Sequence, residues 1–127
     1  MKVSERSLRL MIVDDNADAA SMLAMFLEAA GHEVLIEHDS LQFLERARLE
    51  APDVCILDIG LPDMDGNELA RRLRLRPETA ESVLIAVTGY GQERDKKNAA
   101  VAGFDHHFVK PVDTAGLAAL LAEIGNR

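Results

Sequence analysis

The chain has 127 residues, of which 48% are hydrophobic and 28% charged, and its formal net charge is −8. This length suits a single globular domain, and the acidity argues against direct binding to nucleic acid or to an anionic membrane surface. Cys55 is the single cysteine, which excludes an intrachain disulfide and any zinc site built on two or more cysteines. No signal sequence or membrane-spanning run is visible. We expect one cytoplasmic domain over 1–127, with its core at about 8–124.

Short apolar segments of strand length alternate along the chain with segments of helical length. Strands are predicted over 8–13, 33–37, 53–57, 83–87 and 105–109, and helices over 17–30, 40–50, 66–76, 92–102 and 113–125. Five repeats of strand then helix predict an α/β fold with a parallel sheet. The first, third and fourth strands are nearly continuously hydrophobic, which is typical of strands covered by helices on both faces.

Several helix ends carry recognisable signals. Gly31 and Gly103 each follow an alanine at a helix end, where glycine suits the left-handed position. Asp39 or Ser40, and Asp113, are candidate N-caps.

The helix predicted over 92–102 differs from the others because Val101 is its only large apolar side chain. Two interpretations remain open for this segment. It is a well-solvated surface helix, or a weakly anchored element that moves in a functional switch.

Acidic and polar residues stand where the predicted strands end. The first strand ends in two acids, the third in one, the fourth in a threonine and the fifth in a lysine; these are Asp14, Asp15, Asp58, Thr88 and Lys110. In an open parallel sheet, ligands bind beyond the carboxyl ends of the strands. Four segments far apart in sequence are therefore expected to meet at one edge of the sheet.

Three carboxylates brought together repel one another, at about 4 kcal/mol for a pair ~4 Å apart in an effective dielectric near 20. An all-oxygen site of this kind suits Mg²⁺ rather than zinc. Lys110 and the Thr88 hydroxyl then remain to bind a phosphoryl group. The pattern indicates phosphoryl transfer to a carboxylate, with Asp58 as the acceptor.

The sequence resembles the receiver domains of two-component response regulators from about Leu8 to Ile124. The motifs that carry the resemblance are MIVDD at 11–15, LDIGLPDMDG at 57–66, VTGY at 87–90 and VKP at 109–111. The resemblance implies a flavodoxin-like (βα)5 fold with strand order 2-1-3-4-5. It also implies that a histidine kinase or histidine phosphotransfer protein phosphorylates the chain, and that a downstream output protein or domain reads its state.

The resemblance assigns a role to each site residue. It implies that Mg²⁺ is held by Asp15 directly, by Asp14 through water, by Asp58 and by the backbone carbonyl of Gly60. Thr88 and Lys110 would contact the phosphoryl group on Asp58, and the Lys110–Pro111 peptide bond would be cis.

Three positions depart from the common family pattern and bear on switching. Gly60 stands two residues after the acceptor and Tyr90 two residues after Thr88, where side chains control access of water and partners. His107 stands where the family usually has Tyr or Phe. It either fills the same space as a half-buried histidine or acts as the switch residue, with its charge state as a modulator.

We therefore interpret the chain as a phosphorylatable receiver, monomeric or weakly dimeric, that promotes only its own phosphorylation and dephosphorylation. It is either a stand-alone protein or a piece of a longer one. Two alternatives remain open: a protein-binding module that is not regulated by phosphorylation, and a small Mg²⁺-dependent phosphatase. The phosphatase class typically needs a second acid where Gly60 stands. The arginines at 71, 72, 74 and 76 are predicted to form a solvated face rather than a nucleic-acid site.

Overall fold

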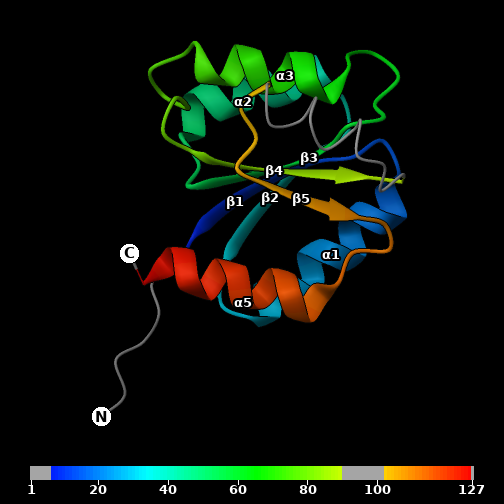
Figure 1. Cartoon of the computed structure of the whole chain (residues 1–127), viewed down its shortest axis with the longest axis vertical. Coiled ribbons are helices and arrows are strands. Elements are labelled where there is room, and N and C mark those ends of the chain that lie inside the picture. Colours follow the sequence, from blue (N-terminus) through cyan, green and yellow to red (C-terminus); the bar gives the residue numbers. More distant parts are fainter. Residues whose placement is uncertain (1–6, 90–101, 127) are drawn as a thin grey trace.

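A parallel sheet of five strands lies between two layers of helices in the computed structural model, which describes residues 7–89 and 102–126 (Figure 1). The elements in chain order are β1 (Arg9–Val13), α1 (Ala17–Ala29), β2 (Glu33–Glu37), α2 (Ser40–Glu50), β3 (Val54–Asp58), α3 (Gly66–Arg74), β4 (Val83–Thr88), β5 (His106–Val109) and α5 (Thr114–Gly125). The strand order is β2-β1-β3-β4-β5, and every neighbouring pair is parallel. The predicted fold class and strand order are confirmed.

The side chains of each strand alternate between two separate cores, one on each face of the sheet. On one face Met11, Cys55 and Leu84 pack with Phe43 of α2 and Leu69 of α3. This layer lies above the sheet in Figure 1.

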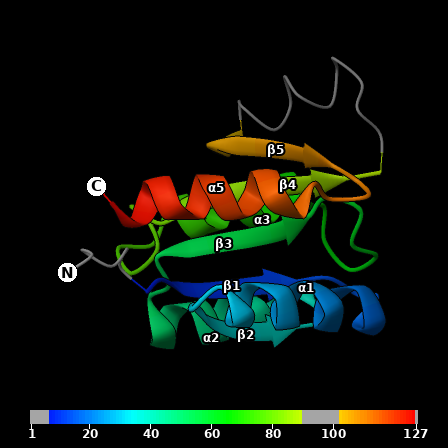
Figure 2. The same ribbon diagram turned by 90° about the horizontal axis from the view of Figure 1, so that it is seen from below.

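On the other face α1 and α5 cover the sheet, and Figure 2, which is viewed from that side, shows both helices in front of the strands. Ile12, Ile56 and Ile85 pack there against Leu27 of α1 and Leu121 of α5. Because both faces are covered, the strands can be hydrophobic at nearly every position. Within the described residues, no helix combines the length and apolar composition needed to cross a bilayer.

The helix boundaries largely follow their sequence signals. Asp39 caps α2 and Asp113 caps α5, with side-chain oxygens that accept hydrogen bonds from Gln42 N–H and Gly116 N–H. Gly31 and Gly103 have positive φ angles, as their positions after alanine predicted. Of the helix predicted over 92–102, the described residues include only Ala102, so both interpretations of that segment concern residues outside the described part of the chain.

The sequence did not predict the role of Arg74, at the end of α3. Its guanidinium donates hydrogen bonds to the carbonyl oxygens of Ala80, Ser82 and Gly103, and to the carboxylate of Asp105. Arg74 therefore ties the end of α3 to the segment before β4 and to the segment before β5. The arginine run on α3 is not uniformly a solvated face, because this member has a defined structural function.

Candidate functional site at the carboxyl ends of the strands

Strand alternation brings three of the predicted site residues to the same face of the sheet. Asp14 comes two residues after Ile12, Asp58 two residues after Ile56, and Lys110 two residues after Phe108. The three apolar residues all pack in the α1/α5 core, and positions two apart in a strand share a face. Each polar residue thus lies on that face at the carboxyl end of its strand.

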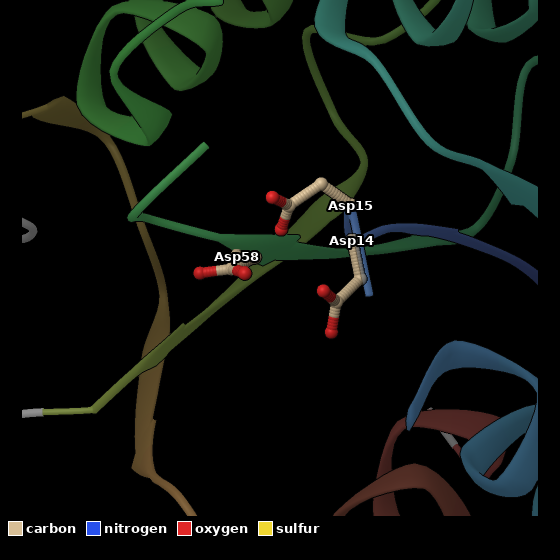
Figure 3. Close-up of side chains that lie close together, drawn as sticks. All are labelled: Asp14, Asp15 and Asp58. Atoms are coloured by element: carbon tan, nitrogen blue, oxygen red, sulfur yellow. The ribbon is translucent and has the colours of Figure 1, made fainter. Parts of the chain in front are cut away.

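The carboxylates of Asp14, Asp15 and Asp58 converge at this edge (Figure 3). One oxygen from each lies within 4.8 Å of the other two. Asp14 and Asp58 are nearly buried, at 9% and 8% exposure, whereas Asp15 is exposed. The cluster is therefore reached from solvent on the Asp15 side and is bounded by the sheet on the other.

Lys110 supplies positive charge to this cluster. Its Nζ lies 3.2 Å from Asp58 Oδ2 and 4.0 Å from Asp14 Oδ2. The pKa of Asp14 is raised above its ordinary value, mainly because burial disfavours the charged form, and the neighbouring Asp58 adds to this. A hydrogen bond from Asn16 N–H to Asp14 Oδ1 and the charge of Lys110 oppose the shift.

Of the remaining predicted residues, Gly60 contacts the Asp58 carboxylate, and Thr88 and Pro111 lie at the ends of the neighbouring strands. Gly60 donates its N–H to Asp58 Oδ1 at 2.9 Å. Thr88 is buried at the end of β4, and its carbonyl accepts a hydrogen bond from Lys110 N–H at 2.7 Å. The Lys110–Pro111 peptide bond is cis, as the resemblance implied. The structure thus brings Asp14, Asp15, Asp58, Gly60 and Lys110 together, with Thr88 on the adjacent strand end.

The donor atoms present fit a hard divalent cation. One oxygen from each of three carboxylates lies within 4.8 Å of the other two, and the donor atoms are all oxygen. Burial and the neighbouring Asp58 disfavour the charged form of Asp14, which a bound cation would favour. Mg²⁺ prefers such oxygen ligands and usually retains several waters, which the exposed side of the cluster allows. The acidic cluster therefore fits a Mg²⁺ site.

Of the two residues predicted to bear on switching from β5 and from the segment after β4, the structure describes His107 but not Tyr90. His107 lies opposite Ala86 in the β4–β5 register, and Ala86 belongs to the core on the α2/α3 face. His107 is partly buried, so its place agrees with the half-buried interpretation, and its role as a switch stays a prediction. Tyr90 lies outside the described residues.

An apolar cavity that the sequence did not predict opens beside the acidic cluster. Its volume is about 490 Å³, and its lining includes Asp58 and Lys110. One wall is made by Met22, Leu23 and Phe26 of α1, and the other includes Val112. Met22 is 72% exposed. The buried residues of α1 are Ala20, Ala24 and Leu27, so its larger side chains Met22 and Phe26 remain partly or largely exposed at this wall.

Loops next to the cluster make contacts that the sequence also did not predict. His38 Nδ1 lies 3.0 Å from the carbonyl oxygen of Asp14, so the β2–α2 loop touches the end of β1. Asp63, in the β3–α3 loop, accepts hydrogen bonds from the backbone N–H and the hydroxyl of Ser40 in α2.

Comparisons with known proteins agree with this geometry. The family model of the response regulator receiver domain matches residues 10–122. Protein PilH of Pseudomonas aeruginosa is 36% identical over 83% of this chain and 87% of its own length. The phosphate regulon transcriptional regulatory protein PhoB of Rhizobium meliloti is 37% identical over 87% of this chain, but over only 49% of its own length. A putative response regulator from Chloroflexus aurantiacus has a crystal structure that superposes with a TM-score of 0.89 at 30% identity, over 96% of this chain and all of that one.

Proposed function

The chain belongs to the response regulator receiver domain family, and from that premise we propose that it accepts a phosphoryl group on Asp58, with Mg²⁺ bound beside that residue. The observation that carries the proposal is the convergence of three carboxylates with Lys110 at one edge of the sheet. We propose further that the chain acts as a single cytoplasmic receiver domain and that phosphorylation changes its affinity for an output protein or domain.

In the proposed reaction an oxygen of the Asp58 carboxylate attacks the phosphorus of a phosphohistidine on the donor protein. A P–O bond forms as the P–N bond breaks, and the imidazole, already protonated on its other ring nitrogen, leaves with the P–N electron pair as the neutral base. Mg²⁺ bound at the cluster supplies charge neutralisation for the transferred oxygens and orients them. The phosphorylated state ends by hydrolysis: water attacks the phosphorus, the P–O bond to Asp58 breaks, and inorganic phosphate and the Asp58 carboxylate are released.

Other residues of the site orient the Asp58 carboxylate and neutralise the charge of the phosphoryl group. Lys110, already 3.2 Å from Asp58, can move its ammonium to an oxygen of the new phosphoryl group. We propose that Thr88, at the end of the neighbouring strand β4, donates its hydroxyl to another of these oxygens. The Gly60 N–H fixes the Asp58 carboxylate before transfer, so less reorganisation is needed in the transition state. We propose that Asp15, Asp58 and the Gly60 carbonyl would hold Mg²⁺ directly, and Asp14 through water.

The apolar cavity supports a protein as the phosphoryl donor. Its lining includes Asp58 and Lys110, and its α1 wall presents Met22 and Phe26 to solvent. A donor histidine carried on a helix must bring its ring to Asp58, and an apolar groove next to Asp58 can bind the apolar face of that helix. We propose that a histidine kinase or histidine phosphotransfer protein docks here while it transfers its phosphoryl group.

The test is incubation with acetyl phosphate in Mg²⁺ or in EDTA, followed by intact-protein mass spectrometry. We expect a gain of one phosphoryl group in Mg²⁺, none in EDTA, and none in Asp58→Asn. Asp18→Asn, which changes an exposed acid of the first turn of α1, is the matched control and should be phosphorylated like the parent. Phosphorylation that survives in Asp58→Asn, or turnover of a generic phosphate ester beyond one equivalent, would contradict the proposal.

A further inference from the structure

The N-terminus of α2 holds two carboxylates from different parts of the chain. Asp39, directly before the helix, accepts a hydrogen bond from Gln42 N–H at 2.9 Å. Asp63, 23 residues beyond Ser40, accepts one from Ser40 N–H at 2.8 Å and one from the Ser40 hydroxyl at 3.1 Å. Ser40 is fully buried. We call the pair of hydrogen bonds between Asp63 and Ser40 the α2 latch.

The physical chemistry of a helix end favours the α2 latch. The first N–H groups of a helix have no partner inside the helix, and the helix dipole stabilises negative charge there. Hydrogen bonds to an ionised carboxylate are also stronger than those between neutral groups. Asp39 already satisfies Gln42 N–H, so Asp63 is not a substitute for a missing cap. What Asp63 adds is a connection between α2 and a loop that leaves the end of β3.

That loop is held at its other positions as well. Ile59 N–H donates to the Val87 carbonyl at 3.0 Å, and Gly66 N–H donates to the Ile59 carbonyl at 3.1 Å. A Cβ added at Gly66 would lie 2.6 Å from Ile59 Cα, so the two loop ends can approach this closely only with glycine there. Leu61 is buried in the α2/α3 core. Gly60 lies between the anchored residues Ile59 and Leu61. Its N–H donates to Asp58 Oδ1 at 2.9 Å, but it has no side chain that could fix the direction of its carbonyl.

We propose that Asp63 is a positioning residue: through the α2 latch it fastens the β3–α3 loop to α2 and thereby keeps Gly60 against Asp58. The inference rests on the proposed function in one respect, because the Gly60 carbonyl is a ligand only if the cluster binds Mg²⁺. Asp63 acts through the loop, since it is not a member of the acidic cluster. Losing the α2 latch frees the loop between Gly60 and Asp63 and misplaces that ligand.

Two measurements on the full chain test the inference. The first is amide hydrogen exchange of residues 59–63 in EDTA, which needs no metal. The second is Mg²⁺ affinity by calorimetric titration. In Asp63→Ala we expect faster exchange at Gly60 and Leu61, and Mg²⁺ binding roughly tenfold weaker, at the lower end of the range for residues that support metal ligands. Asp63→Asn keeps an oxygen for Ser40 N–H, so both effects should be smaller.

Asp39→Ala is the matched control. It removes a carboxylate from the same helix end, so it weakens α2 to a similar degree, but it does not touch the β3–α3 loop. We expect exchange of residues 59–63 and Mg²⁺ affinity to stay within about twofold of the parent, since cap loss acts on the first turn of its own helix. Equal losses of Mg²⁺ affinity in Asp39→Ala and Asp63→Ala would overturn the inference.

Failure of the inference can be told apart from failure of the proposed function. If the parent binds no Mg²⁺, the proposed function fails and the metal part of the inference fails with it. If the parent binds Mg²⁺ but loop exchange and affinity are unchanged in Asp63→Ala, the α2 latch does not position the loop. Should Asp63→Ala not fold, Asp63→Asn and Ser40→Ala decide the matter: parental exchange and affinity in both would overturn the inference.

Discussion

Removing the ammonium of Lys110 should destabilise the fold most when no divalent ion is present. At an effective dielectric near 20, the distance of 3.2 Å to Asp58 corresponds to an attraction of about 5 kcal/mol, and 4.0 Å to Asp14 to about 4 kcal/mol. The Lys110 side chain is 39% exposed, so solvent screens much of this. We expect Lys110→Met to lower the free energy of unfolding in EDTA by about 2 kcal/mol, equivalent to a fall in melting temperature of about 6 °C.

Urea unfolding in EDTA and in excess Mg²⁺ measures the effect. Because Mg²⁺ would neutralise the same carboxylates, the loss caused by Lys110→Met should shrink to below about 1 kcal/mol in Mg²⁺. The loss in EDTA should also be smaller in an Asp58→Asn background, because the nearest partner is then uncharged. Arg72→Met is the control. Arg72 pairs with Glu68 on an exposed face of α3, and its loss should cost about 0.5 kcal/mol or less.

Two results would refute this reasoning. The first is a loss in EDTA no larger than that of the Arg72→Met control. The second is an equal loss with and without the Asp58 charge, which would mean that Lys110 stabilises the fold by packing rather than by charge.

Three further predictions concern other parts of the molecule. Met22→Glu should slow phosphorylation by whichever kinase of a tested panel acts fastest on the parent, by about tenfold, and leave acetyl phosphate labelling unchanged. Leu49→Glu, a change at a similarly exposed residue of α2, should leave the rates of both reactions unchanged. Because the pKa of Asp14 is raised in the fold, the stability it contributes is complete below its ordinary value of 3.8 and is lost as pH rises through the folded pKa. Asp14→Asn in EDTA should therefore be more stable than the parent at neutral pH and equal to it below pH 3.8. Arg74→Lys should lower the free energy of unfolding by about 2 kcal/mol or more, because an ammonium cannot replace the guanidinium hydrogen bonds.

The fold and the acidic cluster could be predicted because each depends on a regular pattern. Apolar strands alternating with helical segments specify the parallel sheet, and a parallel sheet places all its carboxyl strand ends at one edge. Side-chain alternation then puts Asp14, Asp58 and Lys110 on the α1/α5 face without further information. The distances among them follow from the strand register. The register cannot be read directly from the sequence, but the positions of the apolar residues constrain it strongly.

Contacts made by loops and by long polar side chains could not be predicted in the same way. Asp63 sits two residues before the α3 cap, and nothing in its neighbourhood indicates that it binds α2. Arg74 belongs to a run of arginines whose periodicity is that of an exposed helix face, yet its partners are carbonyls of distant segments. The cavity beside Asp58 depends on how α1 is placed against the segment that precedes α5. Each is decided by tertiary packing rather than by local pattern.

A crystal structure of the chain grown with Mg²⁺ and beryllofluoride would examine the acidic cluster, the acceptor and the lysine together. We predict that beryllofluoride binds the Asp58 carboxylate through its beryllium atom and that Mg²⁺ contacts Asp15, Asp58 and the Gly60 carbonyl. The Lys110 ammonium should donate a hydrogen bond to a fluorine of the adduct. Electron density for the adduct at another carboxylate, or a cluster that binds neither ion at millimolar concentration, would contradict the function proposed for this edge of the sheet.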